Sequence, residues 1–110
     1  MKVIITGGAG FIGSHLTEKL ISNKRIKKII LIDHFEDGSK KNLIKVKDSK
    51  KLKIVKENIL KFEKIEKFFK GASYVFHLAA IADIVPSIVN PKEYLDTNFM
   101  GTINVLEASR

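Results

Sequence analysis

Residues 2–13 read KVIITGGAGFIG, and this stretch decides the fold. Residues 2–6 are mostly apolar and β-branched, which is typical of a strand buried on both faces of a parallel sheet. Glycines follow at positions 7, 10 and 13, and apolar residues recur at helical spacing from residue 11 onward. The stretch therefore predicts a strand, a tight glycine loop and a helix in direct succession.

Each of these three glycines has a physical task in such a loop. Gly7 permits the tight turn out of the strand, Gly10 lets the backbone approach a pyrophosphate, and Gly13 lets the helix pack closely on the sheet. The amides of Phe11 and Ile12 then face the phosphates at the positive end of the helix dipole. The spacing indicates a dinucleotide phosphate site at this loop.

An acidic residue ends the next apolar run. Residues 29–32 read IILI, and Asp33 follows them, twenty residues after Gly13. A carboxylate at that place can accept hydrogen bonds from both ribose hydroxyls of an adenosine, and it repels a 2′-phosphate. NAD is therefore expected rather than NADP, with Lys40 and Lys41 further along the chain exposed to solvent.

Four strand-like runs alternate with helical segments along the whole chain. The expected strands cover residues 2–6, 29–32, 52–56 and 74–78, and the expected helices cover residues 11–23, 39–47, 61–70 and 91–110, the last after a loop that contains Pro86. This alternation predicts an α/β protein with a Rossmann-type, doubly wound parallel sheet in the order 3-2-1-4, truncated after the fourth helix. Gly101 inside the last helix predicts that another group packs close to it.

Composition limits the class of protein further. The chain has 110 residues, 45% of them hydrophobic, and no cysteine. This length suits one small domain with a packed core. The lack of cysteine excludes a disulfide framework, and the three histidines are too scattered for a metal site. No apolar run approaches the ~18 residues of a membrane span, so a cytoplasmic protein without a membrane partner is expected.

Positive charge is concentrated in the middle of the chain. Residues 40–70 hold twelve lysines and four acidic residues, which accounts for the whole net charge of +8. Such a segment can attract nucleic acid or an anionic membrane. Because only one arginine precedes the C-terminal residue and no aromatic platform is expected among the lysines, solvated helix and strand faces are favoured over a nucleic-acid partner.

Two further motifs support a resemblance to a known family. The glycine loop has the form TGxxGxxG, residues 77–80 read HLAA, and residues 86–110 read PSIVNPKEYLDTNFMGTINVLEASR. Over its whole length the chain resembles the extended short-chain dehydrogenase/reductases, above all the nucleotide-sugar epimerases and dehydratases, of which UDP-glucose 4-epimerase is the best-known member. The resemblance implies bound NAD and transient oxidation of a sugar hydroxyl.

The resemblance also implies roles for particular residues. Asn58 and Ile59 stand where the family usually has Asp-Ile beside the adenine, and the Asn58 side-chain carbonyl can still accept a hydrogen bond from the adenine amino group. Asn98 would help to order the site from the last helix. The expected cofactor-binding residues are Gly7, Gly10, Phe11, Ile12, Gly13, Asp33, Asn58, Ile59, Leu78, Ala79, Ala80 and Asn98.

The family's catalytic groups are not expected in this chain. They are a Tyr-x-x-x-Lys pair and a Ser or Thr, with the Tyr as base. Leu78 stands four residues after Tyr74, and Asn98 stands four residues after Tyr94, so no catalytic residue is nominated. Residues 1–110 are expected to form a partial NAD-binding domain that lacks the C-terminal catalytic and substrate-binding part and is inactive alone.

Alternatives stay open at this point. The chain can be a non-catalytic dinucleotide-binding or redox-sensing module, or a basic interaction protein, so whether it is an enzyme is undecided. An exposed fourth strand at the sheet edge predicts self-association or a complementing second chain. A nucleotide-sugar substrate is expected only if the missing part is supplied.

Overall fold

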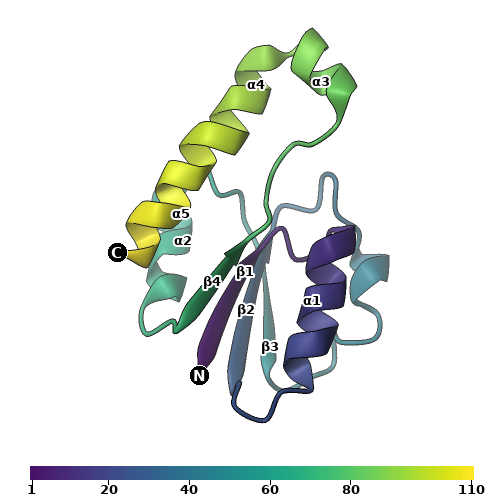
Figure 1. The fold of residues 1–110 in the computed structure, drawn as a ribbon, viewed down its shortest axis with the longest axis vertical. Helices are drawn as coiled ribbons and strands as arrows, with labels where there is room; N and C mark the ends of the chain where they lie inside the picture. The colour runs from purple at the N-terminus through teal and green to yellow at the C-terminus, as the bar shows by residue number, and fades with distance from the viewer.

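The computed structural model of residues 1–110 contains one parallel four-stranded sheet with helices on both of its faces (Figure 1). The strands are β1 (Lys2–Thr6), β2 (Lys28–Asp33), β3 (Leu52–Lys56) and β4 (Tyr74–His77). Their order in the sheet is β3-β2-β1-β4, and every neighbouring pair is parallel. The predicted Rossmann-type order 3-2-1-4 is confirmed.

Five helices and two irregular turns connect and cover the strands. The helices are α1 (Phe11–Ile21), α2 (Phe62–Phe69), α3 (Ile84–Val89), α4 (Pro91–Leu95) and α5 (Gly101–Ser109), and the turns are a 3-10 turn η1 (Lys40–Leu43) and a π turn η2 (Asp96–Met100). The strands, α1 and α2 begin and end within two residues of the predicted bounds. None of the helices is long and apolar enough to cross a lipid bilayer.

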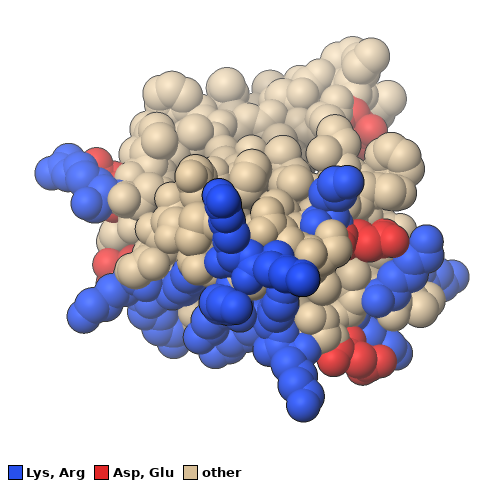
Figure 2. Space-filling model, turned by 60° about the horizontal axis from the view of Figure 1, so that its bottom comes forward, with Lys and Arg blue, Asp and Glu red and all other residues tan.

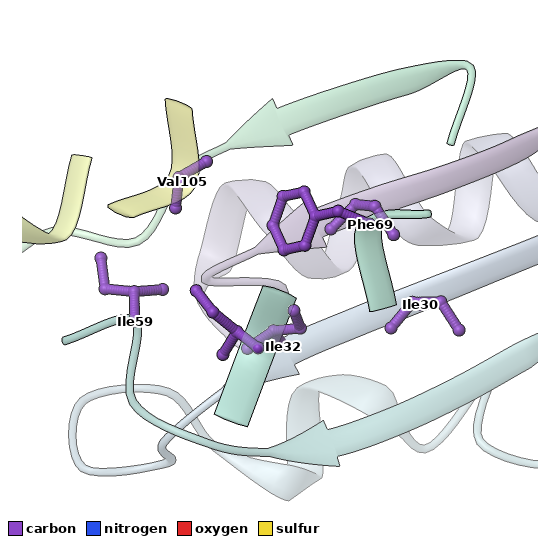
Figure 3. Close-up of a cluster of buried hydrophobic side chains, with 7 residues drawn as sticks. Ile30, Ile32, Ile59, Phe69 and Val105 are labelled. Carbon is purple, nitrogen blue, oxygen red and sulfur yellow. The ribbon is translucent and has the colours of Figure 1, made fainter. Parts of the chain in front are cut away.

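The alternation of side chains along the buried strands separates two cores. Val3, Ile5 and Ile29 point to one face of the sheet, where they pack with Leu20 and Ile21 of α1. The other face carries the larger cluster, which joins the sheet to α2, α5 and the loop after β3 (Figure 3) and consists of Ile4, Ile30, Ile32, Ile59, Ile65, Phe69 and Val105. Burial on both faces explains why β1 and β2 read as continuous apolar runs.

The helix predicted over residues 39–47 is wrong, because only the short turn η1 forms there. Ser39 caps this turn, and its side-chain oxygen accepts a hydrogen bond from the Lys41 amide. Leu43 and Val46 are buried, whereas Ile44 between them is 61% exposed. A 3-10 turn has three residues per turn, so apolar residues three positions apart lie on the same side of it. An α-helix that packs on a core needs a wider apolar face than these two residues provide.

The C-terminal segment also differs from its prediction. Residues 84–89, expected as a loop, form α3, and Pro86 lies in its first turn, where a missing N–H leaves no hydrogen bond unmade. The single helix expected over residues 91–110 is divided by η2 into α4 and α5. Gly101 begins α5, and an added Cβ there would lie 2.5 Å from Cδ1 of Ile59, which confirms the predicted close approach.

Candidate functional site

The carboxyl ends of the four strands surround one cavity. Strand order reverses at β1, since β2 and β3 lie on one side of it and β4 lies on the other. Ligands of open α/β sheets bind at such a switch point. The cavity is lined by Gly7, Gly10, Ile32, Asp33, His34, Asp37, Gly38, Glu57, Ile59, Leu78, Ala79, Ala80 and Thr97.

The glycine loop forms the floor of this cavity without side chains. Gly7 has a φ of +69°, so it makes the predicted left-handed turn out of β1. An added Cβ on Gly7 would lie 2.6 Å from the amide nitrogen of Ala79, and one on Gly13 would collide with the carbonyl oxygen of Gly7. The loop, the start of α1 and the end of β4 therefore approach one another in a way that only glycine permits.

The first turn of α1 presents unpaired backbone amides next to this loop. The capping residue is Gly10, so no side chain bonds to the helix start, and the first turn carries no acidic residue. The side chains of Phe11 and Ile12 are 78% and 68% exposed and do not line the cavity. Their contribution to a ligand is thus limited to the main chain, at the positive end of the helix dipole.

Asp33 lies at the end of β2 with only 8% of its surface exposed. Its Oδ2 accepts a hydrogen bond of 2.9 Å from the Ala9 amide, and its Oδ1 accepts one of 2.8 Å from the Phe35 amide. The carboxylate thereby joins β2 to the glycine loop and is held in one orientation. Each oxygen keeps a further lone pair for a ligand hydroxyl.

Two further acidic side chains line the same part of the cavity, and sequence reasoning missed both. Asp37 follows β2, and Glu57 follows β3. Oε2 of Glu57 accepts a hydrogen bond from the Asn58 amide at 3.1 Å. No lysine or arginine lines the cavity, so its rim has negative electrostatic character.

Asn58 does not line the cavity in this structure. Its Oδ1 accepts a hydrogen bond of 2.9 Å from the Leu60 amide, in the turn that leads into α2. That oxygen keeps a second lone pair, so its contact with an adenine amino group stays a prediction. Its neighbour Ile59 does line the cavity while 96% of its own surface is buried.

A hydrogen-bonded chain supports the β4 side of the cavity. Thr6 Oγ1 accepts hydrogen bonds from the Leu78 and Ala79 amides, each at 3.2 Å, and lies 2.6 Å from Nδ1 of His77. Nε2 of His77 lies 2.8 Å from Oγ1 of Thr102, which itself donates to a backbone carbonyl. These contacts assign the proton of His77 to Nε2, with Nδ1 accepting from Thr6.

The neutral form of His77 suits this arrangement. A protonated imidazole would present a second N–H to Thr6 Oγ1, which already accepts two amides. Burial lowers the pKa of His77 below its ordinary value of 6.5, in agreement with that geometry. His77 thus links β1 to α5 as a structural residue and does not line the cavity.

Asn98 fixes the chain that leaves β4. Its Oδ1 accepts from the Ile81 amide, and its Nδ2 donates to the Ile81 carbonyl, both at 2.8 Å. The paired bonds hold the segment that carries Ala79 and Ala80 against the cavity. Thr97, which sequence reasoning did not select, lines the cavity beside it and is 7% exposed.

The structure brings seven of the twelve predicted residues to the cavity wall. They are Gly7, Gly10, Asp33, Ile59, Leu78, Ala79 and Ala80. The other five do not line it and are Phe11, Ile12, Gly13, Asn58 and Asn98. No group of three His, Asp or Glu side chains is arranged to hold a metal ion.

Comparison with known proteins agrees with this geometry. Residues 3–110 match the sequence model of the NAD dependent epimerase/dehydratase family. UDP-glucuronic acid decarboxylase 1 of Arabidopsis thaliana is 35% identical over 106 residues, covering 96% of this chain and 23% of that protein. A putative UDP-glucose 4-epimerase of Methanocaldococcus jannaschii is 38% identical over 109 residues, covering 98% of this chain and 33% of that protein.

Solved structures show the same fold. The dTDP-glucose 4,6-dehydratase DesIV from Streptomyces venezuelae, with NAD and TYD bound, superposes with a TM-score of 0.93 at 28% identity, over 99% of this chain and 35% of that one. UDP-glucose 4-epimerase from Thermotoga maritima with UDP-glucose gives a TM-score of 0.87 at 36% identity, over 99% of this chain and 34% of that one. The chain therefore spans about a third or less of the length of these relatives.

Proposed function

The chain belongs to the NAD dependent epimerase/dehydratase family, and on that premise we propose that residues 1–110 are the NAD-binding part of a nucleotide-sugar epimerase or dehydratase. The observation that carries the proposal is the cavity at the sheet's switch point, where the glycine loop, Asp33 and the end of β4 meet. Two related structures contain NAD, namely DesIV and the UDP-glucose 4-epimerase of Thermus thermophilus.

The residues present fit a dinucleotide. An anionic pyrophosphate suits the start of α1, where free amides and the helix dipole meet a loop that side chains would fill. The adenine ribose suits Asp33, whose carboxylate is oriented by the Ala9 and Phe35 amides. Small side chains at Ala79 and Ala80 leave room beyond the end of β4 for the other half of the dinucleotide.

The charge of the rim supports NAD over NADP. Asp33, Asp37 and Glu57 lie on the β2 and β3 side of the cavity without a neighbouring cation in its wall. A 2′-phosphate on the ribose would add about two negative charges beside three carboxylates. NADP is therefore rejected by repulsion as well as by the absence of a phosphate-binding arginine or lysine.

Sugar chemistry in this proposal needs polypeptide beyond the 110 residues. Bound NAD+ supplies hydride acceptance and return at a sugar carbon, while this chain holds and orients the dinucleotide. Tyr74 and Tyr94 lack the lysine four residues later, so no residue here is proposed as the base. A continuation of the chain or a second chain would supply that base and the nucleotide-sugar site, in the cytoplasm.

The edge of the sheet supports such completion or self-association. β4 has one strand neighbour, β1, so the other side of β4 is unpaired. A groove along this edge is lined by apolar groups that include Phe69, Val75 and Leu106. Unpaired strand edges recruit other chains, and a sharp monomer in light scattering at high concentration would contradict this part of the proposal.

Calorimetric titration of the folded chain with NAD+, NADH and NADP+ tests the cofactor assignment. We expect micromolar binding of NAD+ and NADH, weaker NADP+ binding, and loss of NAD+ binding in Asp33→Ala. Asp48→Ala removes the same charge outside the cavity and serves as the matched control. Absence of NAD+ binding to a folded sample, or equal binding of NADP+, would contradict the assignment.

A further inference from the structure

Lysine side chains gather at the end of the molecule opposite the cavity. Figure 2 shows them covering the face at the amino-terminal ends of the strands, with few acidic groups between them. Some of these lysines come from the basic segment at residues 40–70, and others come from the starts of β1 and β2. We define the lysine face by Lys2, Lys28, Lys53, Lys67 and Lys70.

Strand register places three of these lysines side by side. Lys2 of β1 is opposite Lys28 of β2, and Lys53 of β3 is opposite Ile30, two residues beyond Lys28. Because side chains alternate between faces, all three lie on the same face of the sheet as Ile4 and Ile30. Adjacent strands are ~4.8 Å apart, so Lys2 and Lys28 are direct neighbours, and Lys53 lies ~7 Å further along the same face.

The end of α2 extends this group of lysines. Lys2 Nζ donates a hydrogen bond of 2.8 Å to the carbonyl oxygen of Lys70. The ammonium groups of Lys53 and Lys67 lie 5.2 and 5.3 Å from the ring centroid of Phe68. The ring thus holds two cations close together through cation–π attraction, and the five positive charges form one surface.

No carboxylate forms an ion pair with this surface. The three ion pairs of the structure join Lys45 to Glu18, Lys92 to Asp96 and Arg110 to Glu107, all outside the lysine face. Glu63 and Glu66 of α2 form no ion pair with it. Burial, followed by the charges of Lys28 and Lys53, lowers the pKa of Lys2. The free protein therefore contains an unbalanced repulsion that a bound anion would relieve.

The sequence favoured merely solvated lysines, but their gathering on one face without an ion pair changes that expectation, and we propose that the lysine face binds the phosphodiester backbone of single-stranded nucleic acid without reading its bases. Five cations spread over three strands and a helix end can contact several successive phosphates of one polymer. A small anion can contact only one or two of these cations at a time. Lysine is a point charge on a flexible stem and lacks the fork with which arginine reads guanine. Phe68 already has cations over its ring, so it offers no stacking platform for a base.

A single strand fits this surface better than a rigid duplex. Sheet twist rotates each strand relative to the next, so we expect the lysine face to curve from the strands towards α2. A flexible backbone can follow that curve. Since the cavity lies at the opposite end of the strands, the lysine face and the proposed cofactor site can be occupied independently.

Salt dependence of binding measures the number of phosphates neutralised. We would titrate a fluorescein-labelled, mixed-sequence 20-nucleotide RNA with the 110-residue chain, following anisotropy between 50 and 200 mM KCl. Five neutralised phosphates predict a slope of log K against log salt of about −3.5, or about a 100-fold loss of affinity over this range. The triple variant K2Q/K28Q/K53Q keeps two of the five lysines, so we expect a slope of about −1.4 and about a 7-fold loss of affinity over the same range.

A second triple variant separates the lysine face from net charge. K41Q/K45Q/K92Q removes the same three charges elsewhere on the surface and should keep the slope of the unmodified chain. Thermal unfolding followed by circular dichroism checks that both triple variants are folded. In K2Q/K28Q/K53Q the relief of repulsion offsets the loss of the Lys2–Lys70 hydrogen bond and the Lys53–Phe68 contact, so its melting temperature should stay close to that of the parent.

Three results would overturn the proposal. One is equal weakening by the two triple variants, which would show a dependence on net charge alone. Another is no RNA binding by the unmodified chain at 50 mM KCl. The third is stronger association with vesicles containing 30% phosphatidylserine than with RNA, lost in K2Q/K28Q/K53Q, which would assign the face to a membrane surface.

Discussion

Replacing Thr6 by valine tests the hydrogen-bonded support of the cavity. Valine has nearly the shape of threonine, so the change removes one hydroxyl from a fully buried position. That hydroxyl accepts from the Leu78 and Ala79 amides and bonds to His77 Nδ1. The Leu78 amide keeps a second acceptor, the Thr6 carbonyl at 3.0 Å. Two groups lose their partner, namely the Ala79 amide and the imidazole nitrogen.

The expected loss of stability follows from those two groups. An unpaired buried polar group costs about 1–3 kcal/mol, and water can reach the half-buried imidazole, so Thr6→Val should destabilise by about 2–4 kcal/mol. A domain of this size has a total stability of about 5–15 kcal/mol. Thr6→Ser, which keeps the hydroxyl and loses one methyl group, should cost only about 1 kcal/mol.

Urea denaturation of the three proteins measures both values. The midpoint should fall in the order parent, Thr6→Ser, Thr6→Val, with an unchanged slope if unfolding stays two-state. NAD+ affinity should fall in Thr6→Val, because the Ala79 amide is no longer held at the cavity wall. If Thr6→Val were as stable as Thr6→Ser, the hydroxyl would have no energetic role and the reasoning would be refuted.

Three other perturbations have defined outcomes. The pKa of His77 is lowered in the folded state, so near and below pH 6.5 the unfolded chain binds more protons than the folded chain. The free energy of unfolding should therefore fall as the pH drops below that value. Urea denaturation at pH 7 and pH 5 measures this fall, and a His77→Gln variant should lose less stability between the two pH values than the parent. Gly13→Ala places a Cβ against the Gly7 carbonyl, whereas Gly71 has a φ of +78° and no atom within 4 Å of an added Cβ. Gly13→Ala should therefore abolish NAD+ binding in calorimetry, and it should lower the free energy of unfolding by more than the ~1 kcal/mol expected for Gly71→Ala. If Gly13→Ala still bound NAD+, the close packing would be contradicted. Gly101→Ala brings a Cβ to 2.5 Å from Cδ1 and 2.8 Å from Cγ1 of Ile59, so Ile59→Ala, which lacks both atoms, should recover about 0.5–2 kcal/mol of the loss in a double-mutant cycle. Strict additivity of the two changes would show that no clash exists.

Much of the site could be predicted because its signals are local. A positive φ at Gly7, a helix starting at Phe11 and a carboxylate ending β2 are all encoded in short stretches of sequence. The contributions of Asp37, Glu57 and Thr97 could not be predicted in this way. They reach the cavity only because loops from separate strands end at the same edge of the sheet.

The sequence also did not predict which backbone groups form hydrogen bonds with the polar side chains of the site. Asn58 carries the right atom for an adenine amino group, and the fold turns that oxygen towards the Leu60 amide, which leaves it one further lone pair. Asn98, which was expected to order the cofactor site, bonds to both backbone groups of Ile81 and so holds the chain that leaves β4. A side chain's chemistry is readable from its type, whereas its partner depends on which backbone group the fold brings nearest.

The sequence by itself determined the element order, the strand order 3-2-1-4 and the glycine loop. Those features follow from hydrophobic periodicity, crossover handedness and the conformational freedom of glycine, which act over a few residues. Only the tertiary structure decided that residues 39–47 form one short turn, that Thr6 supports the end of β4, and that Lys2, Lys28 and Lys53 share one face. The physical reason is that burial, hydrogen-bond partners and charge repulsion depend on distances between strands, and the chain acquires those distances only when it folds.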